Sequence, residues 1–214
     1  MNKALVALIR QILPDLPGFI VKKRLLYLKP IRPILRAVYF DASGYSKDWF
    51  YINEFVQPLY VPNSHFAFNF GNRIRDSQRK DGWDLAKPEI VEEVTSALQE
   101  RALPFLESIV TVDDFIASYR EHSQINPHTP KNIGYSLVRV GRFGEAQEVF
   151  DRLLPQLDLG SSWQLDMDCD IRRLKTLIDN DPAGAIRQLQ DWEVDTARKL
   201  GFSEADWGLI ENSK

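Results

Sequence analysis

Four polar residues interrupt apolar, aromatic-rich segments in the first third of the chain: Arg36, Glu54, Asn69 and Arg73. Successive side chains of a strand point to opposite faces, so Glu54 shares a face with three apolar residues, Phe50, Ile52 and Val56. A carboxylate on such a face needs a partner, or its pKa rises. We favour a structural interpretation, in which Arg36 on a neighbouring strand pairs with Glu54 or a bulge turns Glu54 outward. In the alternative, the four residues form a polar pocket that binds an anion or a partner's side chain.

The chain has three histidines, which are His65, His122 and His128. Zinc signatures usually place histidines three to five residues apart with further ligands nearby, and this spacing does not match. Cys169 has no second cysteine and no adjacent histidine to activate it, although Arg172 and Arg173 follow within one helical turn. We therefore expect surface histidines and a small, buried helical cysteine, with no metal site.

A short acidic run resembles the opening of a calcium loop, with Asp166, Asp168 and Asp170 at alternate positions. Such a loop needs glycine at its sixth position and glutamate at its twelfth. This chain has Ile171 and Leu177 there, so a solvated acidic face of a helix is favoured. The chain also lacks nucleophile-elbow, HExxH, P-loop and GxGxxG motifs. We expect no cofactor, and the absence of these motifs lowers the expectation of an enzyme.

The composition of the 214 residues is that of a folded globular protein, with 44% hydrophobic and 27% charged residues. A single cysteine excludes an internal disulfide framework and favours a reducing compartment. No apolar run approaches the ~20 residues of a membrane span, and the short apolar stretch before Arg10 has no cleavage signal after it. We expect a cytoplasmic protein that does not bind membranes.

The elements that must position the four polar residues follow from the hydrophobic pattern. Apolar residues at helical spacing predict a first helix over residues 2–13. Segments rich in β-branched and aromatic residues, separated by turn clusters, predict strands at 22–29, 34–40, 49–59 and 65–73. The short connections favour an antiparallel sheet of three or four strands. Alternation is strictest in the last segment, with Phe66, Phe68 and Phe70 on one face.

The rest of the chain has helical periodicity and helix start signals. Thr111 with Asp114 predicts a capping box, Thr129 and Asp181 each precede a proline, and Ser203 with Asp206 predicts a last cap. The predicted class is therefore α+β, with a sheet region at 1–83 and a region of packed helical hairpins at 84–214. We expect the two regions to pack together as one unit.

Residues 133–153 (IGYSLVRVGRFGEAQEVFDRL) resemble a single tetratricopeptide-type helical hairpin. Small residues such as Gly134 and Ala146 let two antiparallel helices approach, and Phe143 and Phe150 fill the space beside them. A repeat array needs about three copies, and no convincing second copy is present. The resemblance implies a helical hairpin and a helix-packing surface for a partner.

The N-terminal part resembles small bacterial α+β domains of the immunity-protein type. The matching pieces are Gly18-Phe19, Phe50-Tyr51-Ile52-Asn53 and Phe68-Asn69-Phe70-Gly71. The resemblance implies a domain that binds another protein.

Charge is distributed unevenly along the chain. Residues 1–83 contain 13 Lys and Arg against 6 Asp and Glu, whereas residues 84–214 contain 14 against 24. Either the two halves attract each other, which we favour, or a basic N-terminal surface meets an acidic partner.

The function we predict is a non-catalytic protein-binding module of the immunity or adaptor kind. One alternative is a hydrolase or transferase with its site around Glu54. Another is an RNA-associated protein, which the sequence pI of about 5.7 argues against.

Overall fold

The computed structural model describes residues 3–76, 78, 80–120 and 126–207. The chain forms two compact units. The sheet unit comprises Met1–Gln57, Phe66–Val110 and Ser203–Lys214, and the helical unit comprises Pro58–His65 and Thr111–Phe202.

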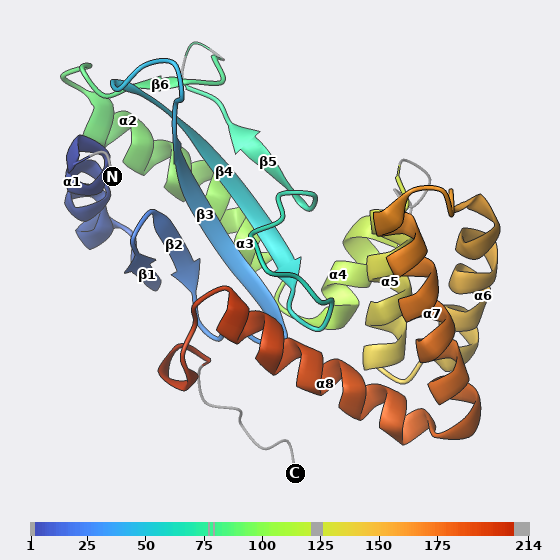
Figure 1. Ribbon diagram of the computed structural model, residues 1–214. Coiled ribbons are helices and arrows are strands. Elements are labelled where there is room, and N and C mark those ends of the chain that lie inside the picture. Colours follow the sequence, from blue (N-terminus) through green and yellow to red (C-terminus); the bar gives the residue numbers. More distant parts are fainter. Residues whose placement is uncertain (1–2, 77, 79, 121–125, 208–214) are drawn as a thin grey trace. The chain divides into compact units, whose positions relative to one another are not determined.

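The sheet unit is built on six strands, β1 (Phe19–Lys22), β2 (Leu25–Leu28), β3 (Ile34–Ala42), β4 (Trp49–Pro58), β5 (Gly71–Ile74) and β6 (Trp83–Asp84). Strands β1 to β5 lie side by side in chain order, and β6 also pairs with β4 (Figure 1). The short connections allow only antiparallel neighbours, as in the registers Leu25↔Tyr39 and Phe55↔Gly71. This meander gives β4 a central position.

Helices cover one face of the sheet. Figure 1 shows α2 (Ile90–Ala97) and α3 (Leu103–Glu107) passing behind the strands, joined by a π-helical turn at Leu98–Ala102. The first helix, α1 (Lys3–Ile12), packs against α2 and buries its apolar stripe, formed by Leu5, Leu8, Ile9 and Ile12. These helices exclude water from the alternate side chains of β3 and β4 that face them.

The C-terminal turn of the sheet unit is held against β1 and β2. The Tyr27 hydroxyl donates to Asp206 Oδ1 at 2.6 Å, and Lys22 Nζ lies 3.6 Å from Asp206 Oδ2. Partial burial alone would raise the pKa of Asp206. The hydrogen bonds from Tyr27 and Ser203 and the charge of Lys22 outweigh it and lower the pKa to about 2. The carboxylate is therefore charged at neutral pH and ties residues distant in the sequence together.

The helical unit contains α4 (Val112–Tyr119), α5 (His128–Arg139), α6 (Phe143–Leu153), α7 (Ser162–Asn180) and α8 (Pro182–Lys199). Helices α5 and α6 form a hairpin whose turn contains Gly141 at φ +77°. At Gly134 the two helices approach so closely that a Cβ atom would overlap the Phe150 ring. The Phe150 ring also meets the Tyr135 ring edge-on at 6.0 Å.

These observations confirm the α+β class, with its N-terminal helix, antiparallel sheet and C-terminal helical region. The sheet has six strands instead of three or four, because β1 and β6 are too short to give a clear pattern. The strand predicted at 65–73 is wrong over residues 65–70, which are irregular, and β5 begins only at Gly71. Phe66 and Phe68 nevertheless share a side, since both pack on Phe55. Among the described helices, none is both long and apolar enough to cross a membrane.

Replacing Gly134 with alanine tests the close approach of α5 and α6. We expect Gly134→Ala to destabilise the fold by about 1–2 kcal/mol. Overpacking against Phe150 costs roughly 1–3 kcal/mol, which outweighs the gain of up to about 1 kcal/mol in helix propensity. Gly144→Ala in α6 is the matched control, because nothing lies within 4 Å of a Cβ there, and it should not destabilise. Urea unfolding followed by circular dichroism measures both, and equal effects of the two changes would contradict the packing argument.

Candidate functional site

The structure places the four predicted site residues on two different faces of the sheet. Arg36 and Glu54 lie on the face under the helices, with 7% and 6% of their surface exposed. Arg73 pairs with Asn53 in the β4–β5 register, one residue from Glu54, so it lies on the opposite face. Asn69 is exposed in the irregular segment before β5. The four residues therefore do not form one pocket.

Glu54 is a buried carboxylate with one hydrogen-bonded oxygen. Asn72, opposite it in β5, donates its side-chain amide to Glu54 Oε1 at 3.2 Å. The other oxygen, Oε2, is buried and has no hydrogen-bond partner among the described residues. Burial raises the pKa of Glu54, while the Asn72 hydrogen bond and the charge of Arg101 act in the opposite direction.

The predicted ion pair between Arg36 and Glu54 is wrong. Within the described part of the chain, the Arg36 guanidinium donates to the Lys29 carbonyl at 3.2 Å and forms no ion pair with Glu54. Burial lowers the pKa of Arg36, and the charge of Glu107 in α3 acts in the opposite direction. The β-strand period placed Glu54 on the apolar face correctly, but it does not determine which polar group on a neighbouring element reaches it.

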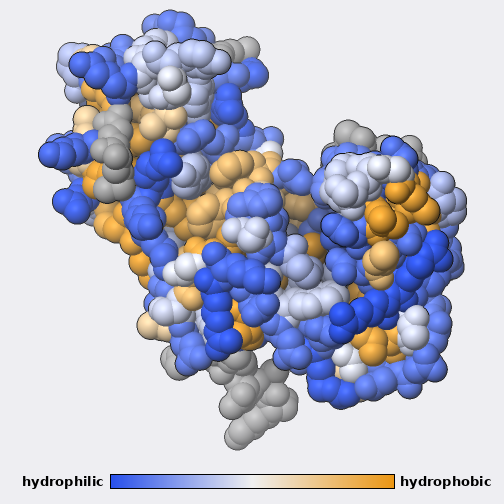
Figure 2. All heavy atoms as spheres, in the orientation of Figure 1, coloured by the Kyte–Doolittle hydropathy of each residue, from blue (hydrophilic) through white to orange (hydrophobic). Residues whose placement is uncertain are grey.

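The opposite, open face of the sheet is lined by aromatic rings, and we call it the aromatic face. It comprises Tyr39, Trp49, Tyr51, Phe55, Phe66 and Phe68. Phe68 and Trp49 are 41% and 37% exposed, and the buried Phe55 ring lies 5.0 Å from the Phe68 ring and perpendicular to it. In Figure 2 an apolar patch bordered by hydrophilic residues lies where the segment leading to β5 crosses β4.

Two arginines lie over rings of the aromatic face. Arg73 Cζ is 4.6 Å from the centre of the Tyr51 ring, and Arg24 Cζ is 5.2 Å from that of Tyr39. Neighbouring polar groups orient both guanidiniums, because Arg73 Nε donates to Asn53 Oδ1 at 3.5 Å and Arg24 donates to the Tyr39 hydroxyl at 2.7 Å. Such stacked cations contribute about 0.5–1 kcal/mol at exposed positions. The face thus combines accessible rings with positioned positive charge.

Sequence reasoning missed the aromatic face as a site, although its signal is present. Trp49, Tyr51 and Phe55 occupy alternate positions of β4, out of phase with the buried Phe50 and Ile52. Because β4 carries apolar or aromatic side chains on both sides, its sequence predicts that both faces of the sheet are covered. That the aromatic side is partly exposed depends on how the rest of the chain packs, which the sequence of the strand does not indicate.

The remaining candidates for chemistry are the histidines, the cysteine and the acidic run of the sequence. Among the described residues, no three His, Cys, Asp or Glu side chains come together as a metal site. His122 and its neighbour Glu121 lie outside the described residues. Cys169 is exposed, so the prediction of a buried cysteine is wrong.

In the acidic run of α7, Asp166 is exposed and Asp170 is half-buried, and Asp168 points away from them, as helical spacing predicts. The Asp168 side chain is buried, with 6% of its surface exposed, and accepts from Arg172 Nε at 2.7 Å. This ion pair joins a buried carboxylate to a guanidinium that is 62% exposed.

Comparisons of the chain with protein-family models, with curated proteins and with solved structures found no match.

The burial of the Glu54 carboxylate leads to a prediction about how the stability of the fold depends on pH. The folded state has a raised Glu54 pKa, above the unfolded value of about 4.5, so folding favours the protonated form. Stability should therefore fall as the pH rises from below 4.5 through the folded pKa, and Glu54→Gln should remove this loss. We expect the free energy of unfolding of Glu54→Gln, relative to the parent, to increase between pH 4.5 and pH 8.

Urea unfolding of the two proteins across this pH range measures the difference. Glu92→Gln, which changes an exposed carboxylate on α2, is the control and should show little pH dependence relative to the parent. A difference in the free energy of unfolding between Glu54→Gln and the parent that stays constant across this pH range would show that burial does not raise the pKa of Glu54.

Proposed function

We propose that this chain is a non-catalytic protein-binding module whose aromatic face docks on an acidic partner. The observation that supports the proposal most is the aromatic face itself, which exposes large rings and two stacked arginines on a rigid sheet. Trp, Tyr and Arg are the residue types enriched at the energetic centres of protein interfaces. Their side chains offer a large contact area with little conformational freedom to lose.

The charge of the surrounding sequence supports an acidic partner. Residues 1–83 contain 13 Lys and Arg against 6 Asp and Glu, and Arg73 is exposed on the face. A partner carboxylate can accept from the Arg73 guanidinium while its apolar side chains cover Phe68 and Trp49. An immunity or adaptor role is the biological setting that we propose for such binding.

An enzyme centred on Glu54 has less support. Glu54 is 6% exposed, so little of its surface is accessible to a substrate. A general acid or base must lie within hydrogen-bond reach of the proton it transfers, directly or through one water. The environment of Glu54 is that of a buried structural group.

The aromatic face also has features of a nucleic-acid surface, because bases stack on exposed rings beside arginines. Such binding weakens steeply with salt, which separates it from docking of a protein on apolar rings. The acidic sequence pI of about 5.7 favours a protein partner.

Variants of the aromatic face test the proposal. We expect the parent protein to retain one stoichiometric protein partner in affinity isolation from its source, and Tyr51→Ala and Arg73→Glu each to weaken this binding at least tenfold. The loss follows because the first change removes a central ring and the second reverses the cation stacked on it. Binding of the purified partner is measured by calorimetry at two salt concentrations.

Two controls make the result specific to the face. Tyr45→Ala removes a fully exposed ring from the β3–β4 loop, and Lys3→Glu reverses a charge on α1, so both should leave the affinity unchanged. Equal affinity of the Tyr51 and Arg73 variants and the parent would refute docking on this face. Recovery of RNA, with affinity that falls steeply between low and physiological salt, would instead support the RNA alternative.

A further inference from the structure

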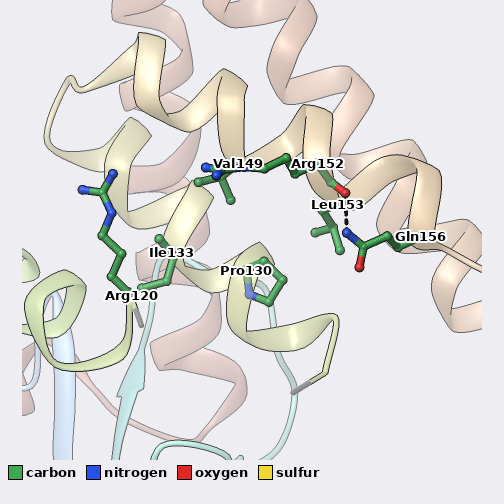
Figure 3. A pocket seen from close by; sticks show the side chains of 7 residues that line it. All are labelled: Arg120, Pro130, Ile133, Val149, Arg152, Leu153 and Gln156. Atoms are coloured by element: carbon green, nitrogen blue, oxygen red, sulfur yellow. Dashed lines mark hydrogen bonds between the residues drawn. The ribbon is translucent and has the colours of Figure 1, made fainter. Parts of the chain in front are cut away.

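The helical unit contains a cavity of about 510 Å³ between the end of α4 and the α5–α6 hairpin (Figure 3). Its lining residues are Arg120, Pro130, Ile133, Val149, Arg152, Leu153 and Gln156. A volume of this size lies in the range of cavities that hold small organic molecules, roughly 300–1,000 Å³. The described lining residues all belong to the helical unit, whereas the aromatic face is formed by residues of the sheet unit.

The apolar wall of the cavity consists of aliphatic side chains. Val149 and Leu153 are four residues apart on α6, so they lie on one face of the helix, and Ile133 faces them from α5. These three side chains are 8%, 3% and 1% exposed, so packing fixes their positions and a ligand contacts only the small part of their surface that borders the cavity. The described lining contains no aromatic ring, which favours a flexible hydrocarbon chain over a flat ring as the ligand.

Arg120 contributes a positioned cation at one side of the cavity. Its NH1 lies 2.9 Å from Glu145 Oε2, and Arg142 donates to both oxygens of the same carboxylate, at 2.7 and 2.8 Å. Two guanidiniums thus share one carboxylate, whose pKa these hydrogen bonds lower to about 2. Because a guanidinium has five N–H donors, this arrangement orients Arg120 and leaves donors for a ligand.

Arg152 contributes a second cation from α6. Its Nε donates to the Glu148 carbonyl at 3.1 Å, which holds the side chain along its own helix and leaves the two terminal nitrogens available. In Figure 3 the Arg152 side chain extends along α6 toward the side on which Arg120 lies. Among the described residues, the lining contains these two arginines and no carboxylate, and Arg120 pairs with Glu145 beside the cavity.

The geometry points to a binding site for a small aliphatic monocarboxylate. The carboxylate would accept hydrogen bonds from Arg152 and Arg120, and its hydrocarbon chain would lie against Ile133, Val149 and Leu153. Guanidinium–carboxylate pairing is directional and strengthened by charge, and the aliphatic wall excludes water from the chain. A ligand with a carboxylate at one end and a hydrocarbon chain at the other accounts for both the two cations and the apolar wall.

A free acid matches the lining better than the end of a peptide. A peptide would bring several backbone N–H and C=O groups that need partners once they are buried. Among the described lining residues other than the two arginines, the polar side chain is that of Gln156, whose amide nitrogen donates to the Arg152 carbonyl at 2.7 Å. The cavity therefore suits a ligand that is polar at one end only.

Methyl NMR of the full-length protein, titrated with octanoate, tests the inference. We expect saturable shifts of the Ile133, Val149 and Leu153 methyl signals, and Arg152→Gln to weaken octanoate binding about tenfold. Arg120→Gln should weaken it as well, whereas Arg152→Lys should retain part of the affinity because it keeps the charge. Arg187→Gln, which removes an exposed charge on α8 outside the cavity, is the matched control and should bind like the parent.

The neutral analogue 1-octanol and a short peptide ending in a free leucine carboxylate complete the experiment. Octanoate binding that exceeds 1-octanol binding at least tenfold, and that depends on Arg152, supports a carboxylate site. Equal binding of octanoate and 1-octanol, binding of the peptide but not of octanoate, or no saturable shift at the three methyl groups would each overturn it. The methyl spectrum of each variant also shows whether it is folded, so loss of binding is separated from loss of structure.

Discussion

The contact between β4 and β5 at Gly71 fixes the positions of the residues that matter most in the sheet unit. A Cβ atom at Gly71 would overlap the backbone of Glu54 and Phe55, so only glycine allows β5 to approach here. This approach sets the register Phe55↔Gly71, which in turn places Asn72 opposite Glu54 and Arg73 opposite Asn53. A shift of one residue would exchange the two faces. The amide that binds the buried carboxylate and the cation on the aromatic face thus depend on one close contact.

Local rules predicted the elements well where a short stretch of sequence determines the structure. The Thr111–Asp114 capping box and the Asp181 cap of α8 are present as expected, because each needs only residues within one helical turn. The start of α5 was predicted less well. The sequence pattern indicated Thr129 as the cap, but the Asn126 side chain accepts from the N–H groups of His128 and Thr129. The prediction failed where distant segments meet: Glu54 binds Asn72 instead of Arg36, and sequence spacing does not specify that choice.

The two surfaces proposed for binding share a way of positioning arginine. Asn53 and the Tyr51 ring hold Arg73, and Glu145 holds Arg120. A free arginine side chain loses roughly 2 kcal/mol of rotamer entropy when a ligand immobilises it, so a partner within the protein reduces the cost of binding. Neither set of partners is local in sequence, so the sequence pattern singled out Arg73 but did not indicate which groups would hold either arginine.

Two carboxylates with shifted pKa values, Glu54 and Glu145, show how burial and ion pairing limit access to a titratable group. Catalysis needs a group whose pKa is shifted and which a substrate can also reach. Burial raises the pKa of Glu54, but the same burial closes access to it. The pKa of Glu145 falls to about 2 because Arg142 and Arg120 bond to it, and these bonds occupy its oxygens. Both carboxylates are therefore engaged within the protein, which agrees with the proposal of a binding module.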